Sequence, residues 1–188
     1  MVARFIDNHI ICLFCLRGKL MKKRIRNKLN KRNREELVHA IYEGHIRKVR
    51  LLVRCKTDAD YKDQDGWTPL HWATQECQME IIQYLLFKGA NINSKDNNGF
   101  SPLYQAASEG RIKLVDFLID KGAEIDIRSS NGTTPLIIAS CYGHLESVKY
   151  LVGKGADINV KEDKGNTALS FAVQYGNEKV ALFLKEQS

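Results

Sequence analysis

A chain of 188 residues, 44% hydrophobic and 27% charged, has the composition of a folded, water-soluble domain, which argues against disorder throughout. The formal net charge of +7 is unevenly distributed: residues 1–34 carry 11 Lys/Arg against one acidic residue, whereas residues 35–188 carry 18 against 21. The basic character therefore belongs to the N-terminal segment and does not mark the body of the chain as a nucleic-acid binder.

The N-terminal segment, residues 1–32, is expected to be a basic, disordered leader. Its apolar run Ile10 to Leu16 is short, follows polar residues and lacks a small-residue cleavage site, so it makes a poor signal peptide, and it is too short to span a bilayer. The basic block from Lys22 to Arg32 has three interpretations: a nuclear-import signal, a contact for anionic lipid or nucleic acid, or a solvated arm. The solvated arm is the preferred interpretation, and Met21 is an alternative start.

The five cysteines follow no disulfide framework, and their number is odd. They are Cys12, Cys15, Cys55, Cys77 and Cys141. The pair in CLFC lacks the further ligands of a zinc site and the strand-to-helix context of a redox pair. We therefore expect free thiols and a reducing compartment, the cytoplasm first, with the nucleus or secretion as an effector as the alternatives.

After the leader, one pattern returns every 33 residues. DGWTPLHWAT from Asp65 is followed by NGFSPLYQAA from Asn98, NGTTPLIIAS from Asn131 and KGNTALSFAV from Lys164. Three residue types recur in phase: Gly66, Gly99, Gly132 and Gly165; Leu37, Leu70, Leu103, Leu136 and Leu169; Ala40, Ala73, Ala106, Ala139 and Ala172. Over about residues 33–188 the chain resembles the ankyrin repeat family, whose T-P-L-H-x-A motif is matched in full by TPLHWA.

The residues explain the repeat unit without the family name. A hydroxyl residue able to cap a helix opens each pattern, at Thr68, Ser101, Thr134 and Thr167. Proline follows at the first helical position in three of them, at Pro69, Pro102 and Pro135. Glycine arrives about two turns later, at Gly44, Gly110, Gly143 and Gly176, and predicts a turn into a second helix; Cys77 stands at this place in one repeat.

The second helices carry apolar residues at helical spacing and end at KGAN, KGAE and KGAD. One such unit cannot bury its apolar face alone, so the units must stack. The predicted fold is an all-α repeat solenoid of stacked helix-turn-helix ankyrin repeats with β-hairpin-like turns. Repeats 1 to 5 are assigned to about residues 32–64, 65–97, 98–130, 131–163 and 164–188, and both ends are expected to be polar caps, with Lys48 and Lys185 at positions that are apolar elsewhere.

No catalytic centre is expected. The resemblance makes His71 structural, bonded near the capping threonine of its own or an adjacent turn, and the equivalent residues Tyr104, Ile137 and Ser170 repeat no chemistry. His45 and His144 match the Gly-His pair of the family and are also expected to be scaffold. No nucleophile, base and orienting group can be assembled, and a solenoid offers a groove where an enzyme needs an enclosed pocket. We expect no cofactor, no metal and no small-molecule substrate.

The resemblance implies that the concave surface, formed by the turn tips and the exposed face of each first helix, binds a partner protein. The residues expected there are Trp67, Phe100 and Thr133 at the turns and Tyr42, Gln75, Glu109, Tyr142 and Tyr175 at the ends of the first helices. Exposed aromatic residues are favoured interface anchors. The alternative is that Trp67 and Phe100 only stack on each other, and Trp72 and Phe171 are assigned to packing between helices.

The main functional hypothesis is therefore a monomeric, non-catalytic adaptor. Its rival is a tether in which the basic block from Lys22 to Arg32 binds nucleic acid or an anionic membrane and the repeats present it. Salt distinguishes the two, because phosphate contacts weaken steeply with ionic strength and an aromatic groove does not.

Overall fold

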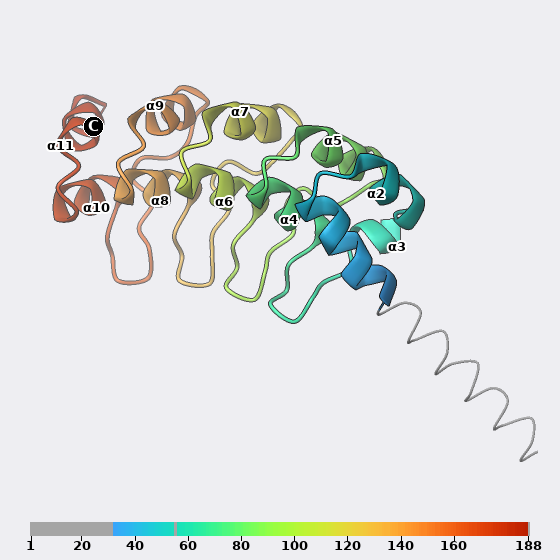
Figure 1. The fold of residues 1–188 in the computed structure, drawn as a ribbon. Coiled ribbons are helices and arrows are strands. Elements are labelled where there is room, and N and C mark those ends of the chain that lie inside the picture. The colour runs from blue at the N-terminus through green and yellow to red at the C-terminus, as the bar shows by residue number, and fades with distance from the viewer. Residues whose placement is uncertain (1–31, 55, 188) are drawn as a thin grey trace, which may run out of the picture.

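The computed structural model describes residues 32–54 and 56–187, and over them the predicted all-α solenoid is confirmed. Residues 32–42 are helical, and α2 to α11 follow as two rows of short helices from which hairpin turns project to one side (Figure 1). None of the described residues lies in a β-strand. Nearly all of the leader, with its apolar run and the basic block before Arg32, lies outside the described residues.

The first, inner helices of repeats 2 to 5 are seven residues long and begin where the sequence places them. They are α4 (Pro69–Gln75), α6 (Pro102–Ser108), α8 (Pro135–Cys141) and α10 (Ala168–Gln174). The hydroxyl oxygens of Ser101, Thr134 and Thr167 each accept a backbone N–H from the first helical turn, which satisfies a donor that the helix itself cannot. The capping residues therefore fix the start of each inner helix.

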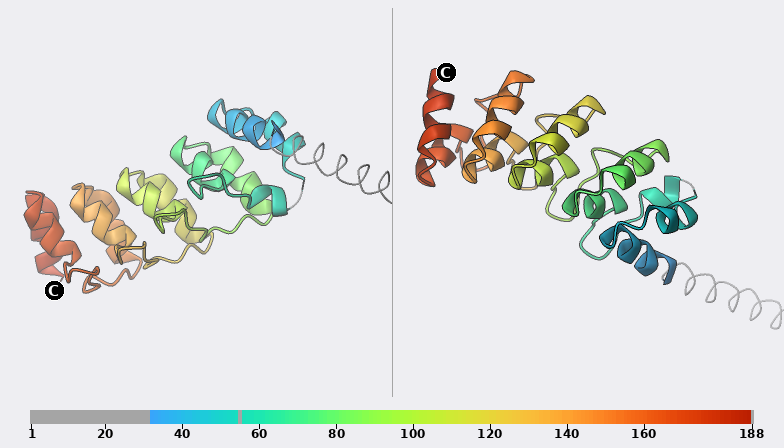
Figure 2. Two further views of the ribbon diagram at one scale, coloured as in Figure 1. Left: turned by 90° about the horizontal axis from the view of Figure 1, so that it is seen from below. Right: turned by 45° about the horizontal axis from the view of Figure 1, so that its top comes forward.

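The second, outer helices form the other row of the stack. They are α2 (Ile46–Leu52), α5 (Met79–Phe87), α7 (Ile112–Asp120), α9 (Leu145–Gly153) and α11 (Glu178–Glu186). Successive helix pairs are displaced in one direction, so that each pair packs only on its neighbours (Figure 2). Repeat 1 alone has an additional short helix, α3 (Lys56–Ala59), in the connection to repeat 2, which the sequence pattern did not predict.

The turns between repeats are hairpin-like, as expected, and they are bonded to one another. In each turn a backbone N–H bonds the carbonyl oxygen four residues on, as from Asp96 to Phe100 (3.0 Å). The next turn adds a backbone bond across the repeats, for example from Ser130 N–H to the Asn98 carbonyl (2.9 Å). Basic side chains form a parallel ladder along the same edge: Lys62 to the Lys95 carbonyl, Lys95 to the Arg128 carbonyl and Arg128 to the Lys161 carbonyl. The turn tips are therefore held in register.

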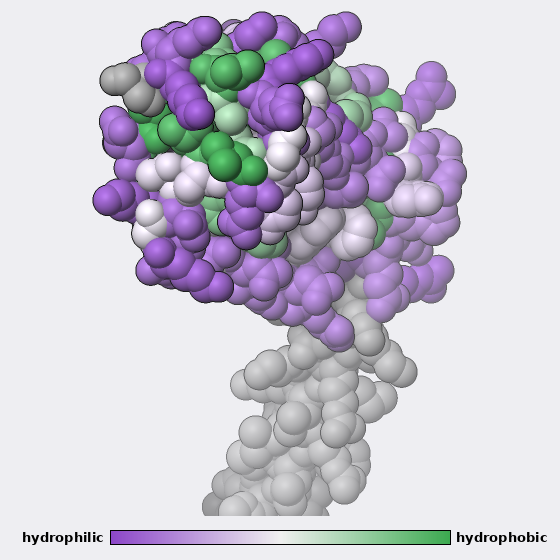
Figure 3. Space-filling view, turned by 90° about the vertical axis from the view of Figure 1, so that its left-hand side faces the viewer, coloured by the Kyte–Doolittle hydropathy of each residue, from purple (hydrophilic) through white to green (hydrophobic). Residues whose placement is uncertain are grey.

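The core is one continuous cluster shared between repeats, and its two ends differ. Lys48 and Lys185 are exposed, as expected, but the outward face of repeat 5 is only partly polar. Val173 is 58% exposed although the equivalent Thr74, Ala107 and Ser140 are buried beneath the following repeat. Leu182 is also exposed, and apolar side chains gather on this end of the stack (Figure 3). At the other end Leu51, one of the apolar residues of the second helices, is 70% exposed.

The turn between inner and outer helices needs a left-handed backbone, and Cys77 adopts it at φ 52° without being glycine. Gly110 and Gly143 stand in the equivalent turns with φ of 66° and 75°. Among the described residues, Cys77 is the one non-glycine residue at positive φ. The repeat phase assigned to Cys77 is therefore confirmed.

Candidate protein-binding groove

The aromatic residues at the turn tips are positioned by aspartates at the start of each turn. The Asp63 carboxylate accepts the backbone N–H of Trp67 (2.9 Å), and the Asp96 carboxylate accepts the backbone N–H of Phe100 (2.8 Å). Asp63 also accepts the indole N–H of Trp72 at 2.9 Å. Both turns contain the bond from the aspartate carboxylate to the backbone N–H four residues on. The side chains of Trp67 and Phe100 therefore start from equivalent backbone positions in adjacent repeats.

Each of these aromatic rings packs against another ring of its own repeat. The Trp67 ring lies 4.7 Å from that of Trp72 at a tilt of 56°, and the Phe100 ring lies parallel to that of Tyr104 at 4.4 Å. Trp67 and Phe100 are half-buried and lie outside the hydrophobic core cluster, whereas Trp72 and Phe171 pack against the cluster as the sequence predicted. Trp67 and Phe100 therefore form walls of a surface and not part of the core.

These walls enclose a hollow of about 240 Å³ across the inner helices α4, α6 and α8, here called the central hollow. Five of the eight residues predicted for partner binding line it: Trp67, Gln75, Phe100, Glu109 and Tyr142. Tyr142 is 60% exposed at its rim. The fold thus brings residues 75 positions apart in the chain to one small surface.

A second hollow of about 820 Å³, the N-terminal hollow, lies between the helix of residues 32–42 and the first turn. Tyr42, another of the predicted residues, lines it together with Val38, Tyr61 and Trp72. Since Trp72 lines this hollow and Trp67 lines the central one, the pair of rings in contact lies between the two hollows. Sequence reasoning missed Tyr61, although an aromatic residue at the position of Ser94, Ile127 and Val160 distinguishes repeat 1.

Two predicted residues lie elsewhere. Thr133 was expected at the groove, but it is only 5% exposed, because its hydroxyl bonds Ser129 and Tyr104 inside the scaffold. We therefore remove Thr133 from the candidate surface. Tyr175 is 57% exposed beyond both hollows, with its ring parallel to that of Phe171 at 6.1 Å.

His71 is structural, as expected, and it connects two repeats. Its Nδ1 accepts the backbone N–H of Thr68 (3.1 Å), and its Nε2–H donates to the carbonyl oxygen of Phe100 (3.0 Å). Burial lowers the pKa of His71 below its ordinary value of 6.5, outweighing the carboxylates of Asp63 and Asp96. The neutral imidazole therefore joins the cap of α4 to the next turn and helps to place Phe100 at the groove.

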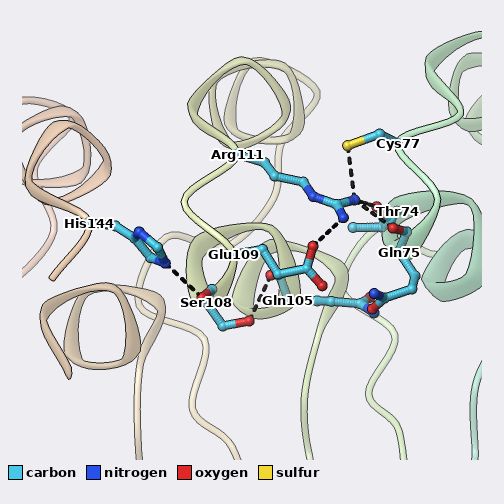
Figure 4. Close-up of polar contacts among 8 residues, drawn as sticks. All are labelled: Thr74, Gln75, Cys77, Gln105, Ser108, Glu109, Arg111 and His144. Atoms are coloured by element: carbon cyan, nitrogen blue, oxygen red, sulfur yellow. Dashed lines mark hydrogen bonds and ion pairs between the residues drawn. The ribbon is translucent and has the colours of Figure 1, made fainter. Parts of the chain in front are cut away.

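A polar junction behind the central hollow holds Gln75 and Glu109 in place (Figure 4). Arg111 donates to the carbonyl oxygens of Thr74 (2.9 Å) and Gln75, and its guanidinium pairs with Glu109. The Gln75 amide oxygen accepts from Gln105. A cation at the C-terminal end of α4 is favourable because the helix dipole is negative there. Gln75 and Glu109 thus line the hollow as side chains already fixed by the scaffold.

In the following repeats, a different side chain bonds the carbonyl oxygens at the end of the preceding inner helix. His144 bonds the Ser108 carbonyl (2.9 Å), and Asn177 bonds the carbonyls of Ser140 and Cys141. His144 is therefore part of the scaffold, as predicted. At the Arg111 junction the guanidinium also lies 2.9 Å from the thiol of Cys77, as Figure 4 shows beside the His144 junction.

The described side chains offer little for catalysis. Thr68 Oγ1 lies 2.8 Å from His71 Nδ1, an arrangement that resembles a nucleophile and its base, but each residue is only 1% exposed. In the described part of the chain, no three His, Cys, Asp or Glu side chains are grouped to hold a metal ion. Cys77 and Cys141 are free thiols. No helix within residues 32–54 and 56–187 is long and apolar enough to cross a bilayer.

Comparison with known proteins agrees with this geometry. The family model described as ankyrin repeats (3 copies) matches residues 3–96, 37–129 and 103–188. The chain therefore belongs to the ankyrin repeat family, whose arrays are protein-interaction modules.

The curated relatives match over short regions. Protein phosphatase 1 regulatory subunit 27 of Mus musculus is 38% identical over 55 residues, which are 29% of this chain and 36% of the relative. Ankyrin repeat domain-containing protein 40 of Homo sapiens is 37% identical over 62 residues, 32% of this chain and 17% of the relative. The palmitoyltransferase AKR1 of Candida glabrata is 33% identical over 60 residues, 32% of this chain and 8% of that enzyme. The match thus spans about a third or less of each relative.

Proposed function

We propose that the chain is a non-catalytic adaptor that binds a partner protein through the two hollows on its inner helices. The observation that carries this proposal is that Trp67, Phe100 and Tyr142 converge on one hollow although none of them belongs to the core cluster. Large aromatic side chains bury much area for few frozen torsions, and such residues dominate binding energy in protein interfaces.

Hydrogen bonds within the scaffold hold the walls of the proposed site. The bonded turn tips, the His71 connection to Phe100 and the Arg111 junction hold the walls of the central hollow in one arrangement. A preformed surface avoids the entropy cost of ordering its side chains on binding. One relative is named as a regulatory subunit of a phosphatase, which fits a chain that acts by binding another protein. That name does not identify the partner of this chain.

The test is site-specific photo-crosslinking in the full chain. A benzophenone amino acid at position 142, on the rim of the central hollow, is compared with the same probe at position 149 on the outer helix α9, where Lys149 is exposed. We expect discrete partner crosslinks from position 142, persisting at about 0.3 M salt, and none of the same mass from position 149.

Two outcomes would contradict the groove proposal. Crosslinks that are equal from both positions would locate the contact away from the inner helices. Partner capture that is abolished by moderate salt and by replacing the lysines of the basic block from Lys22 to Arg32 with glutamine would favour the tether to nucleic acid or membrane instead.

A further inference from the structure

The last residue of the outer helix α5, Phe87, is 82% exposed, more than any other large apolar side chain in the described part of the chain. The other repeats place polar residues or glycine at this position: Arg54, Asp120, Gly153 and Glu186. Phe87 also lies outside the core cluster. Neither the repeat pattern nor folding therefore accounts for an aromatic residue here.

Phe87 borders a hollow of about 560 Å³, here called the outer hollow. Its apolar lining comes from Leu86, Ala90 and Ile92 at the end of repeat 2 and from Phe117 on α7. The helices α5 and α7 belong to the outer row in Figure 1, whereas the central hollow lies across the inner row. The two hollows share no residue, so a ligand of one leaves the lining of the other free.

Two lysines bring positive charge to the outer hollow, one in its lining and one beside Phe87. Lys121 lines it with its ammonium 5.6 Å from the centre of the Phe117 ring, and the Lys88 ammonium lies 5.8 Å from that of Phe87. Within residues 32–54 and 56–187, neither ammonium is paired with a carboxylate, and no carboxylate lines the hollow. Lys154, the equivalent residue of the next repeat, is instead bonded to Asp120 (3.3 Å).

We propose that the outer hollow is a second docking site, which receives an acidic segment of a partner protein carrying one bulky apolar side chain. The apolar side chain packs against Phe87 and Phe117, and the neighbouring carboxylates reach Lys88 and Lys121. Charge complementarity favours this occupant, because a segment with carboxylates neutralises two cations that the scaffold leaves unpaired. An anionic bilayer is the alternative occupant, and the vesicle measurement below distinguishes it from a peptide.

Selection from a random library of displayed 12-residue peptides, with the full chain as bait, tests this site. We expect the enriched peptides to combine an aromatic or large aliphatic residue with two or more acidic residues. Their affinity should fall at least tenfold with Phe87→Ser and with Lys121→Glu, and less with Lys121→Gln. Lys154→Glu is the matched control, because this ammonium is already bonded to Asp120, and it should change affinity less than threefold.

A melting curve of each variant verifies that the exposed substitutions leave the fold intact. Tyr142→Ala should leave these peptides bound, which separates this site from the groove of the proposed function. The proposal is overturned if no enriched peptide depends on Phe87, or if the dependent peptides are basic or uncharged. It is also overturned if vesicles containing phosphatidylserine bind in a Phe87-dependent manner and no peptide does.

Discussion

The inner helices of repeats 2 and 4 both open with Thr-Pro-Leu, and both begin at the proline, yet the same positions serve different purposes. Trp67 in repeat 2 remains half-buried at the groove, whereas Thr133 in repeat 4 is bonded inside the scaffold. His71 connects two repeats through hydrogen bonds, whereas Ile137 is an apolar core residue. Equivalent positions thus share one backbone conformation, and the side chain determines whether the residue packs in the scaffold or faces the groove.

The largest effect on folding is expected from Trp72, which packs against the core and donates its indole N–H to Asp63. Trp72→Ala should lower the free energy of unfolding by about 3 kcal/mol, within the range for removing a large packed side chain. Ile138→Ala, at the equivalent position of repeat 4, should cost about 2 kcal/mol because it loses less volume and no hydrogen bond. Urea unfolding followed by circular dichroism measures both, and a Trp72→Ala cost below that of Ile138→Ala would refute this comparison.

His71 should make repeat 2 sensitive to acid in a way that repeat 4 is not. Its folded pKa is below 6.5, so below pH 6.5 the unfolded chain binds a proton that the folded chain excludes. Stability is therefore complete above pH 6.5 and falls as the pH decreases, by at most about 1.4 kcal/mol per pH unit until the folded pKa is reached.

The unfolding free energy at pH 7.5 and 5.5, measured for the wild type and for His71→Gln, tests this contribution. The wild type should lose more stability between the two values than the variant, which has no imidazole to protonate at this position. Equal losses in the two proteins would show that other groups carry the pH dependence.

A smaller effect is expected at Cys77, where the turn holds a side chain at φ 52° while repeat 4 has Gly143. Cys77→Gly should raise the unfolding free energy by about 1 kcal/mol by removing the steric cost of Cβ in the left-handed region. The bonds from Arg111 to the carbonyls of Thr74 and Gln75 do not require the thiol. Cys77→Ala is the control, since it retains Cβ, and an equal gain in this variant would assign the effect to the thiol.

The sequence was sufficient for the backbone of the stack. The 33-residue period, the capping hydroxyls and the turn glycines are local features, so helix starts such as Pro69 and the left-handed turn at Cys77 could be predicted from them. The additional helix α3 was missed because repeat 1 lacks the regular pattern at that point.

The candidate groove was predictable only in part, because side-chain partners come from neighbouring repeats. Thr133 is removed from the surface by Tyr104, 29 residues away, and Gln75 is held by Gln105. Such pairings depend on how the repeats pack, and they produce no pattern that repeats every 33 residues in the sequence.

Trp67 and Phe100 are proposed to serve binding more than folding, and the double variant Trp67→Ala/Phe100→Ala separates these two roles. With the partner identified by crosslinking, its affinity and the unfolding free energy are measured for the double variant, Trp72→Ala and the wild type. We predict a folding cost below about 2 kcal/mol and a loss of affinity of about 30-fold, as for interface anchors. A folding cost equal to that of Trp72→Ala, or unchanged partner affinity, would overturn the groove proposal and make both aromatic residues structural.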